Sequence, residues 1–80
     1  MLTQLANRRI VVGSKQLRKA LNNGRATLVF LARNADPAIT EEIESICRQK
    51  SVEVTWVQNM LDLGHACGID VGAAAAAAVD

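Results

Sequence analysis

The chain alternates between short runs of β-branched or apolar residues and longer segments whose apolar residues repeat at helical spacing. Ile10 to Gly13 is the first such run, a strand pattern that ends in glycine. The next segment is predicted to be a helix because its apolar residues fall on one side: Leu17, Ala20 and Leu21. We expect Ser14 to cap this helix with its hydroxyl oxygen and Asn23–Gly24 to end it.

A second strand and a second helix follow. Thr27 to Ala32 is a continuous apolar run, which is typical of a central strand covered on both faces. Asp36–Pro37 has the pattern of an N-cap followed by proline at the first helical position. The apolar side of this second helix repeats at helical spacing through Ile39, Ile43, Ile46 and Cys47.

The last part of the chain predicts a third strand, a short helix and a closing strand. Val52 to Val57 alternates and is rich in β-branched residues, and Asn59 is expected to cap a helix that Gly68 ends. Ala73 to Ala78 favours a helix on intrinsic propensity alone, but it follows a glycine and completes a βαβα alternation. We therefore expect a strand there, whose small side chains let helices pack closely.

The element order βαβαβαβ predicts an α/β protein, a three-layer α/β/α sandwich with a four-stranded mixed sheet. Half of the residues are apolar and 21% are charged, which excludes an intrinsically disordered chain. Because 80 residues leave room for one core, we expect residues 1–80 to form a single domain.

Charge is distributed unevenly although the formal net charge is only +1. Residues 1–34 hold seven bases and no acid, whereas residues 35–80 hold eight acids and two bases. The bases of the first part are Arg8, Arg9, Lys15, Arg18, Lys19, Arg25 and Arg33. This division favours a basic face that binds a polyanion about as much as it favours two halves that neutralise each other in the folded domain.

Several classes of protein do not fit this chain. The longest uncharged apolar stretch, Val71 to Val79, is far shorter than the roughly 20 residues of a transmembrane helix. The N-terminus lacks the pattern of a secretory signal, which predicts a cytoplasmic location. Cys47 and Cys67 lack CxxC spacing and further cysteine partners, so we expect two buried thiols and no disulfide.

Catalytic and metal-binding patterns are weak. His65 is the single histidine, and its spacing from Cys67 places the two on different sides of a helix, which does not suit a nucleophile and its base. We interpret His65 as a surface or boundary residue. The acids and cysteines also lack zinc or calcium spacing. We therefore expect no enzyme activity, no metal and no cofactor.

The segment from Gly13 to Lys19 is predicted to bind an anion. A helix start presents free N–H groups, the glycine allows close approach, and Lys15 and Lys19 lie one turn apart. Neither GxxxxGK[ST] nor GxGxxG is present, so a mononucleotide site is not indicated. With only Phe30 and Trp56 as aromatic residues, base stacking on single-stranded RNA is disfavoured and a folded RNA is the better target.

Four segments on these elements resemble the kink-turn-binding ribosomal protein superfamily, in its small bacterial, YbxF-type branch. The segments are Gly13-Ser14-Lys15-Gln16-x-x-Lys19-Ala20-Leu21, Leu28 to Ala32, Ala35-Asp36-Pro37 and Leu63-Gly64-His65-Ala66-Cys67-Gly68-Ile69. The resemblance extends over about residues 9 to 79. It implies an α/β/α sandwich, in agreement with the element order, and binding to RNA kink-turns, in which tandem sheared G·A pairs lie beside a sharply bent backbone.

The resemblance also implies which residues touch RNA. The G·A pairs would meet the turn at residues 13 and 14 through its backbone, Lys15 and Gln16 through base edges, and Lys19 at guanine or phosphate. The loop at residues 69–72 would cover unpaired nucleotides, and two residues near the start of the second helix would line a pocket for a flipped base. The implied RNA-binding residues are Gly13, Ser14, Lys15, Gln16, Lys19, Asp36, Thr40, Ile69, Asp70, Val71 and Gly72.

The residues leave open the base preference at the helix start and the place of two apolar loop residues. Many members of the superfamily carry Asn-Glu where this chain has Lys15–Gln16; glutamine keeps an acceptor without the charge, and lysine cannot accept a hydrogen bond. Ile69 and Val71 also fit a second interpretation, in which both are core residues tucked under the domain.

The sequence thus predicts a monomeric, non-enzymatic RNA-binding protein that recognises a kink-turn in structured RNA, in ribosomal RNA or a riboswitch, and binds no membrane. The alternative is a ribosome-associated module that binds another protein through its basic helix and has no specific RNA site of its own.

Overall fold

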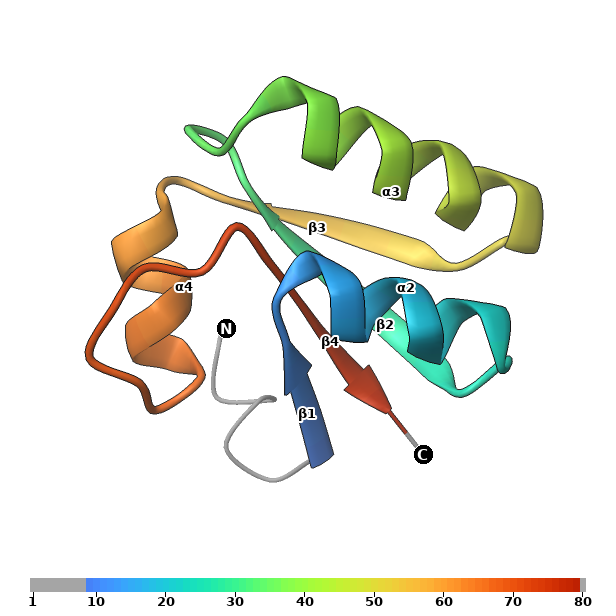
Figure 1. The fold of residues 1–80 in the computed structure, drawn as a ribbon, viewed down its shortest axis with the longest axis horizontal. Helices are drawn as coiled ribbons and strands as arrows, with labels where there is room; N and C mark the ends of the chain where they lie inside the picture. The colour runs from blue at the N-terminus through green and yellow to red at the C-terminus, as the bar shows by residue number, and fades with distance from the viewer. Residues whose placement is uncertain (1–8, 80) are drawn as a thin grey trace.

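The structure, a computed structural model, describes residues 9–79 and arranges them as four strands and three helices (Figure 1). The strands are β1 (Arg9–Val12), β2 (Ala26–Ala32), β3 (Glu53–Val57) and β4 (Ala75–Val79). The helices are α2 (Ser14–Asn22), α3 (Pro37–Lys50) and α4 (Met60–Ala66). Every predicted element is present with its predicted type, and the boundaries shift by a residue or two.

The sheet is mixed and has the strand order β1-β4-β2-β3. β4 is antiparallel to both of its neighbours, whereas β2 and β3 are parallel. β1, β2 and β3 therefore run in one direction and finish at the same end of the sheet, where β4 begins. We call this end the loop end; α2, α3 and α4 all start there, toward the left of Figure 1.

Helices cover both faces of the sheet, which confirms the predicted α/β/α sandwich. α2 and α3 pack on one face, where Leu17 and Ile43 share a buried cluster with Val29 of β2. α4 covers the other face, where Leu63 shares a cluster with Phe30, the next residue of β2. Full burial of a large apolar side chain contributes about 1.5–3 kcal/mol, so these side chains hold the helices on the sheet.

β4 is made almost entirely of alanine and lies at the centre of the core. Ala75 to Ala78 each have 0% exposed surface, although alanine has the highest helix propensity of all residues. The strand forms because its backbone pairs with β1 on one side and β2 on the other, and because methyl side chains leave room for helices on both faces. The strand expected at Ala73 to Ala78 is confirmed, with its start at Ala75.

Two of the three predicted helix caps are confirmed, and one is wrong. The carboxylate of Asp36 and the amide oxygen of Asn59 accept backbone N–H bonds of 2.9 Å and 2.8 Å in the first turns of α3 and α4. Ser14 does not cap α2, because it is already the first helical residue and Gly13 holds the N-cap position. Gly13 has a φ of 99°, a left-handed backbone that glycine adopts without steric cost, so the turn into α2 comes one residue earlier than expected.

The loop between α4 and β4 lies against α4 at two glycines. A Cβ at Gly64 would overlap the carbonyl oxygen of Val71, and a Cβ at Gly72 would lie 3.1 Å from the Cβ of Met60. The N–H of Ala73 also donates to the Met60 carbonyl at 2.9 Å. The course of residues 69–72 therefore depends on the missing side chain at Gly64.

Gly64→Ala is expected to lower the free energy of unfolding by on the order of 1–2 kcal/mol. Alanine gains about 1 kcal/mol of helix propensity over glycine, but the added methyl group forces the backbone at Val71 to move, and overpacking of this kind typically costs about 1–3 kcal/mol or more. Urea denaturation measures the difference. His65→Ala, at the exposed neighbouring position, serves as the control and should change stability by less than about 0.5 kcal/mol. A Gly64→Ala protein that is more stable than the wild type would contradict the close approach.

Candidate nucleic-acid interface

Four connecting segments meet at the loop end and are joined by backbone hydrogen bonds. They are the turn into α2, the β2–α3 loop, the β3–α4 loop and the α4–β4 loop. The N–H of Gly13 donates to the carbonyl of Ala75 at 2.9 Å, and the N–H of Arg33 donates to the carbonyl of Val57 at 2.8 Å. These main-chain bonds fix where the segments lie, so their side chains remain available for contacts with a ligand.

The start of α2 presents a basic and polar surface. Lys15, Gln16 and Lys19 are exposed, while Gly13 and Ser14 are half-buried in the turn. No side chain caps this helix, and the first N–H groups of a helix have no acceptor within it. They point outward at the positive end of the helix dipole. This arrangement suits a phosphate or an electronegative base edge.

The α4–β4 loop places an apolar side chain in solvent. Val71 is 66% exposed, whereas Ile69 is half-buried and packs against the apolar cluster beneath α4. Asp70 and Gly72 are exposed as well. The interpretation of both apolar residues as core is therefore wrong for Val71, and Ile69 anchors the loop from which Val71 projects.

Asp36 and Thr40 lie at different depths. Asp36 is exposed, but one carboxylate oxygen accepts the N–H of Ala38 and so helps to start α3. Thr40 is only 6% exposed, and its hydroxyl donates to the carbonyl of Pro37 at 3.5 Å. The structure therefore brings Asp36 to the surface of the loop end and leaves Thr40 behind it, where it supports the first turn of α3.

Two residues at the loop end were not predicted from the sequence to belong to the site. Asn34 accepts the N–H of Met60 through its amide oxygen at 2.8 Å, which ties the β2–α3 loop to the start of α4. Arg33 is exposed, and its guanidinium lies 5.7 Å from the ring centre of Trp56, a cation–π distance. Asn34 follows a strand as many loop residues do, and nothing local indicates that it caps a helix 26 residues further along.

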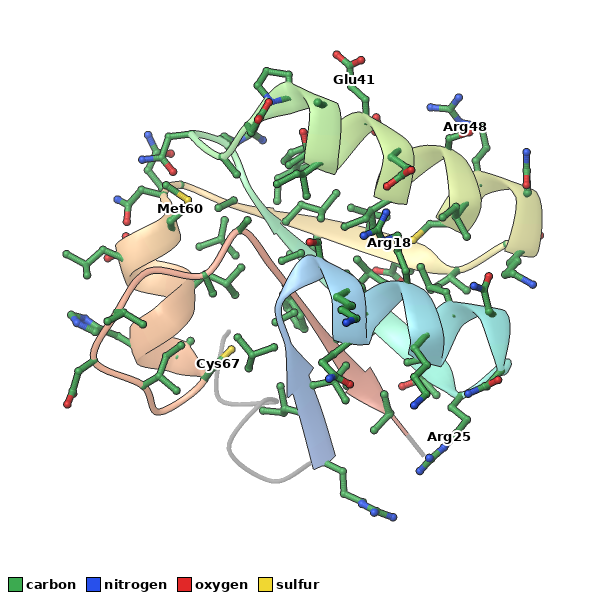
Figure 2. The ribbon with its side chains drawn as sticks, in the orientation of Figure 1. Arg18, Arg25, Glu41, Arg48, Met60 and Cys67 are labelled. Carbon is green, nitrogen blue, oxygen red and sulfur yellow. The ribbon has the colours of Figure 1, made fainter. Side chains whose placement is uncertain are left out.

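The bases of α2 differ in their surroundings. Arg18 turns toward α3 and pairs with Glu42 at 2.7 Å, between the two helices in Figure 2. Arg48 lies near Glu44 of its own helix, at 4.0 Å. Of these ion pairs between described residues, only the first joins a base of the N-terminal half to an acid of the C-terminal half. Lys15 and Lys19 form no ion pair with a described residue and keep their charge exposed.

The two cysteines and the single histidine are the remaining reactive side chains. Cys47 is buried as expected and Cys67 is half-buried; neither forms a disulfide. Burial raises the pKa of both thiols, and Glu44 raises that of Cys47 further, so both stay protonated at neutral pH. His65 is exposed, as predicted. Within residues 9–79 no cluster of three or more possible ligands could hold a metal ion, and no helix is long and apolar enough to cross a membrane.

Known proteins resemble this chain over nearly its whole length. A model of the ribosomal protein L7Ae/L30e/S12e/Gadd45 family matches residues 2–80. The RNA-binding protein YbxF of Geobacillus stearothermophilus is 46% identical over 69 residues, which are 86% of this chain and 84% of that protein. The large ribosomal subunit protein eL8 of Halobacterium salinarum is 37% identical over 68 residues, which are 84% of this chain and 57% of that protein.

A solved structure supports the same relationship. The 15.5kD RNA binding protein of Giardia lamblia superimposes with a TM-score of 0.83 at 30% identity, over 89% of this chain and 60% of that one. The family resemblance inferred from the motifs is therefore confirmed by the match over residues 2–80 and by relatives at 37–46% identity. The chain belongs to the ribosomal protein L7Ae/L30e/S12e/Gadd45 family.

Proposed function

We propose that this protein binds RNA kink-turns through the loop end of its sheet, with residues 1–80 acting as one RNA-binding domain. The observation that carries the proposal is a juxtaposition of two surfaces. The uncapped, basic start of α2 and the exposed Val71 of the α4–β4 loop lie at the same end of the sheet. Its relatives are named as RNA-binding and ribosomal proteins, which supports RNA as the partner.

The two surfaces suit the two parts of a kink-turn. Backbone N–H groups at Gly13 and Ser14 and the amide of Gln16 can hydrogen-bond the exposed edges of sheared G·A pairs, because glutamine both donates and accepts. Lys15 and Lys19 can neutralise the phosphates that crowd at the bend. Val71 then covers the unpaired nucleotides as an apolar contact, while Asp36 is exposed at the start of α3.

The distribution of aromatic residues favours a folded RNA over a single strand. Phe30 is 2% exposed and belongs to the core. Trp56 lies on the edge strand β3 and has Arg33 over its ring. The sheet therefore offers no row of aromatic side chains on which successive bases could stack. Recognition by shape and by a few base edges needs no such row.

The proposal needs one protein chain, no cofactor and no chemical step. We propose that the protein acts as a monomer in the cytoplasm, on ribosomal or riboswitch RNA, and that it is not an enzyme. The family and the names of its relatives support RNA binding and not catalysis.

The main test compares two RNAs that differ only in the tandem G·A pairs. One carries an intact kink-turn, and in the other the G·A pairs are replaced by Watson–Crick pairs. We expect the kink-turn to bind about 10³-fold more tightly or better at physiological salt, the usual margin of specific over non-specific sites. Gel-shift titrations measure both affinities. Equal affinity for the two RNAs would contradict the proposal and favour the alternative of a protein-interaction module.

Gln16→Ala is expected to cost about 1–3 kcal/mol on the kink-turn and much less on the Watson–Crick control RNA, because a base-edge contact is lost and no charge changes. The matched control is Gln49→Ala, an exposed glutamine near the far end of α3. It should leave both affinities unchanged. Equal losses on both RNAs would show that Gln16 does not read the G·A pairs.

Val71→Ser is expected to weaken kink-turn binding by roughly fivefold or more while leaving the melting temperature nearly unchanged. The side chain is 66% exposed in the free protein, and exposed substitutions usually change stability by less than about 0.5 kcal/mol. Thermal melts and titrations on the same sample separate the two effects. Val71→Ile keeps the apolar contact and should bind normally. A destabilised Val71→Ser protein with normal affinity would remove this loop from the interface.

A further inference from the structure

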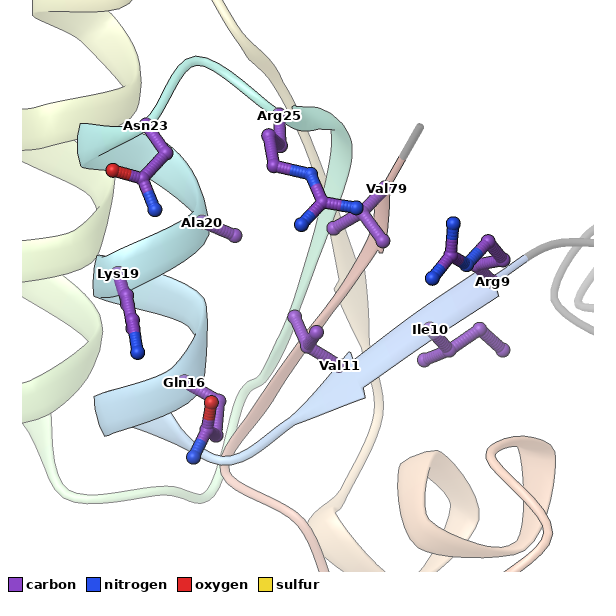
Figure 3. A pocket seen from close by; sticks show the side chains of 9 residues that line it. All are labelled: Arg9, Ile10, Val11, Gln16, Lys19, Ala20, Asn23, Arg25 and Val79. Atoms are coloured by element: carbon purple, nitrogen blue, oxygen red, sulfur yellow. The ribbon is translucent and has the colours of Figure 1, made fainter.

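A basic hollow lies on the α2 side of the sheet and extends from Gln16, near the start of α2, to Asn23 at its end (Figure 3). Its volume is about 280 Å³. Gln16, Lys19 and Asn23 follow one another along α2 on one side of it, and Arg9 of β1 lies on the other side. Arg25, which directly precedes β2, completes the rim.

Strand register explains why two arginines distant in sequence lie at the same end of this hollow. Arg9 in β1 and Ala26 in β2 both pair with Val79 of β4, from opposite sides. Neighbouring strands are about 4.8 Å apart, so the backbones at Arg9 and Ala26 are separated by about 10 Å. Arg25 precedes Ala26, and in Figure 3 its guanidinium and that of Arg9 both lie beside Val79.

The described residues around the hollow carry charge of one sign. Among the described residues that line it, three are basic and none is acidic. Arg9 and Lys19 are exposed, and neither forms an ion pair with another described residue. Two side-chain amides, on Gln16 and Asn23, add hydrogen-bond donors. A positive hollow with several N–H donors is the chemistry that recognises phosphate oxygens.

The apolar floor and the size of the hollow also bear on the kind of ligand it can bind. Val11, Ala20 and Val79 line it with apolar surface, which lowers the local dielectric constant and strengthens attraction between the rim and an anion. The hollow, at about 280 Å³, lies at the small end of the roughly 300–1,000 Å³ of small-molecule pockets, and its charge suits the phosphates of a passing strand.

We propose that this hollow binds backbone phosphates of the RNA stem that adjoins the kink-turn, with Gln16 at its boundary with the base-reading contacts and Arg9 and Arg25 as positioning residues at its other end. The proposal rests on the proposed function, because it assumes that RNA is bound at the loop end. Gln16 and Asn23 are seven residues apart on α2, which corresponds to about 10 Å along the helix axis. A strand that leaves the start of α2 and follows the helix therefore reaches Arg9 and Arg25 after a few nucleotides.

The test measures how binding to the kink-turn RNA depends on salt for Arg9→Gln, Arg25→Gln and the double variant. Each phosphate contact contributes close to 0.9 to the slope of log affinity against log salt on a duplex. We expect the slope to become shallower by roughly one for each arginine removed. The wild type should also lose affinity when one of the two flanking stems is shortened, and the double variant should lose much less. Discrimination against the Watson–Crick control RNA should persist in all variants.

Charge-preserving and distant variants serve as controls. Arg9→Lys and Arg25→Lys keep the charge and should keep the slope, which separates the role of charge from any structural role of these side chains. Arg48→Gln removes an exposed arginine from α3 and should leave the slope unchanged. Thermal melts verify that each variant is folded.

An unchanged slope in the folded double variant would overturn the proposal and leave an acidic protein segment as the candidate for this surface. Failure of the proposed function has a different result, because the wild type would then bind both RNAs equally. In that case the slopes on plain duplex RNA decide whether the hollow binds phosphate at all.

Discussion

Burial of the alanine strand β4 is the constraint on which the rest of the structure depends. Ala75 to Ala78 are completely covered, with β1 and β2 on either side and a helical layer over each face. Larger side chains in this strand would push α2 or α4 away from the sheet, since protein interiors leave little free space. The same strand sets the loop end, because its first carbonyl accepts the N–H of Gly13 and so fixes the turn into α2.

In this arrangement the backbone holds the loop end in place, and the side chains supply the groups that would contact RNA. The segments at the loop end are held by main-chain bonds and by the close contact of Gly64 with the loop at Val71. The side chains that would touch RNA, such as Gln16 and Val71, contribute little to holding the fold together. A scaffold of this kind allows the residues of the interface to change while its geometry stays constant.

Periodicity was sufficient to predict the elements and layers, because core positions repeat at the spacing of the structure they form. Even the strand at Ala75 followed from the alternation of elements, against the local propensity of alanine. One failure is local, and the others concern contacts between distant segments. Ser14 looked like a cap because its position relative to the glycine turn could not be read from spacing. Asn34 binds the start of α4 and Gly64 admits the α4–β4 loop, and neither relation has a local pattern.

The strand order also decides where the bases of the N-terminal part lie in the folded domain. The bases of residues 9–34 lie in β1, in α2 and directly before and after β2. Because β4 lies between β1 and β2, Arg9 and Arg25 lie on the two sides of one strand end. The proposed base-reading contact at Gln16 and the end of the hollow at Asn23 are thereby separated by about 10 Å along α2. At physiological ionic strength the screening length is about 8 Å, and effects of sites more than about 7–10 Å apart usually add. In the proposed complex, the start of α2 would select the RNA by hydrogen bonds of short range, while Arg9 and Arg25 at the other end of the hollow would add affinity through charge.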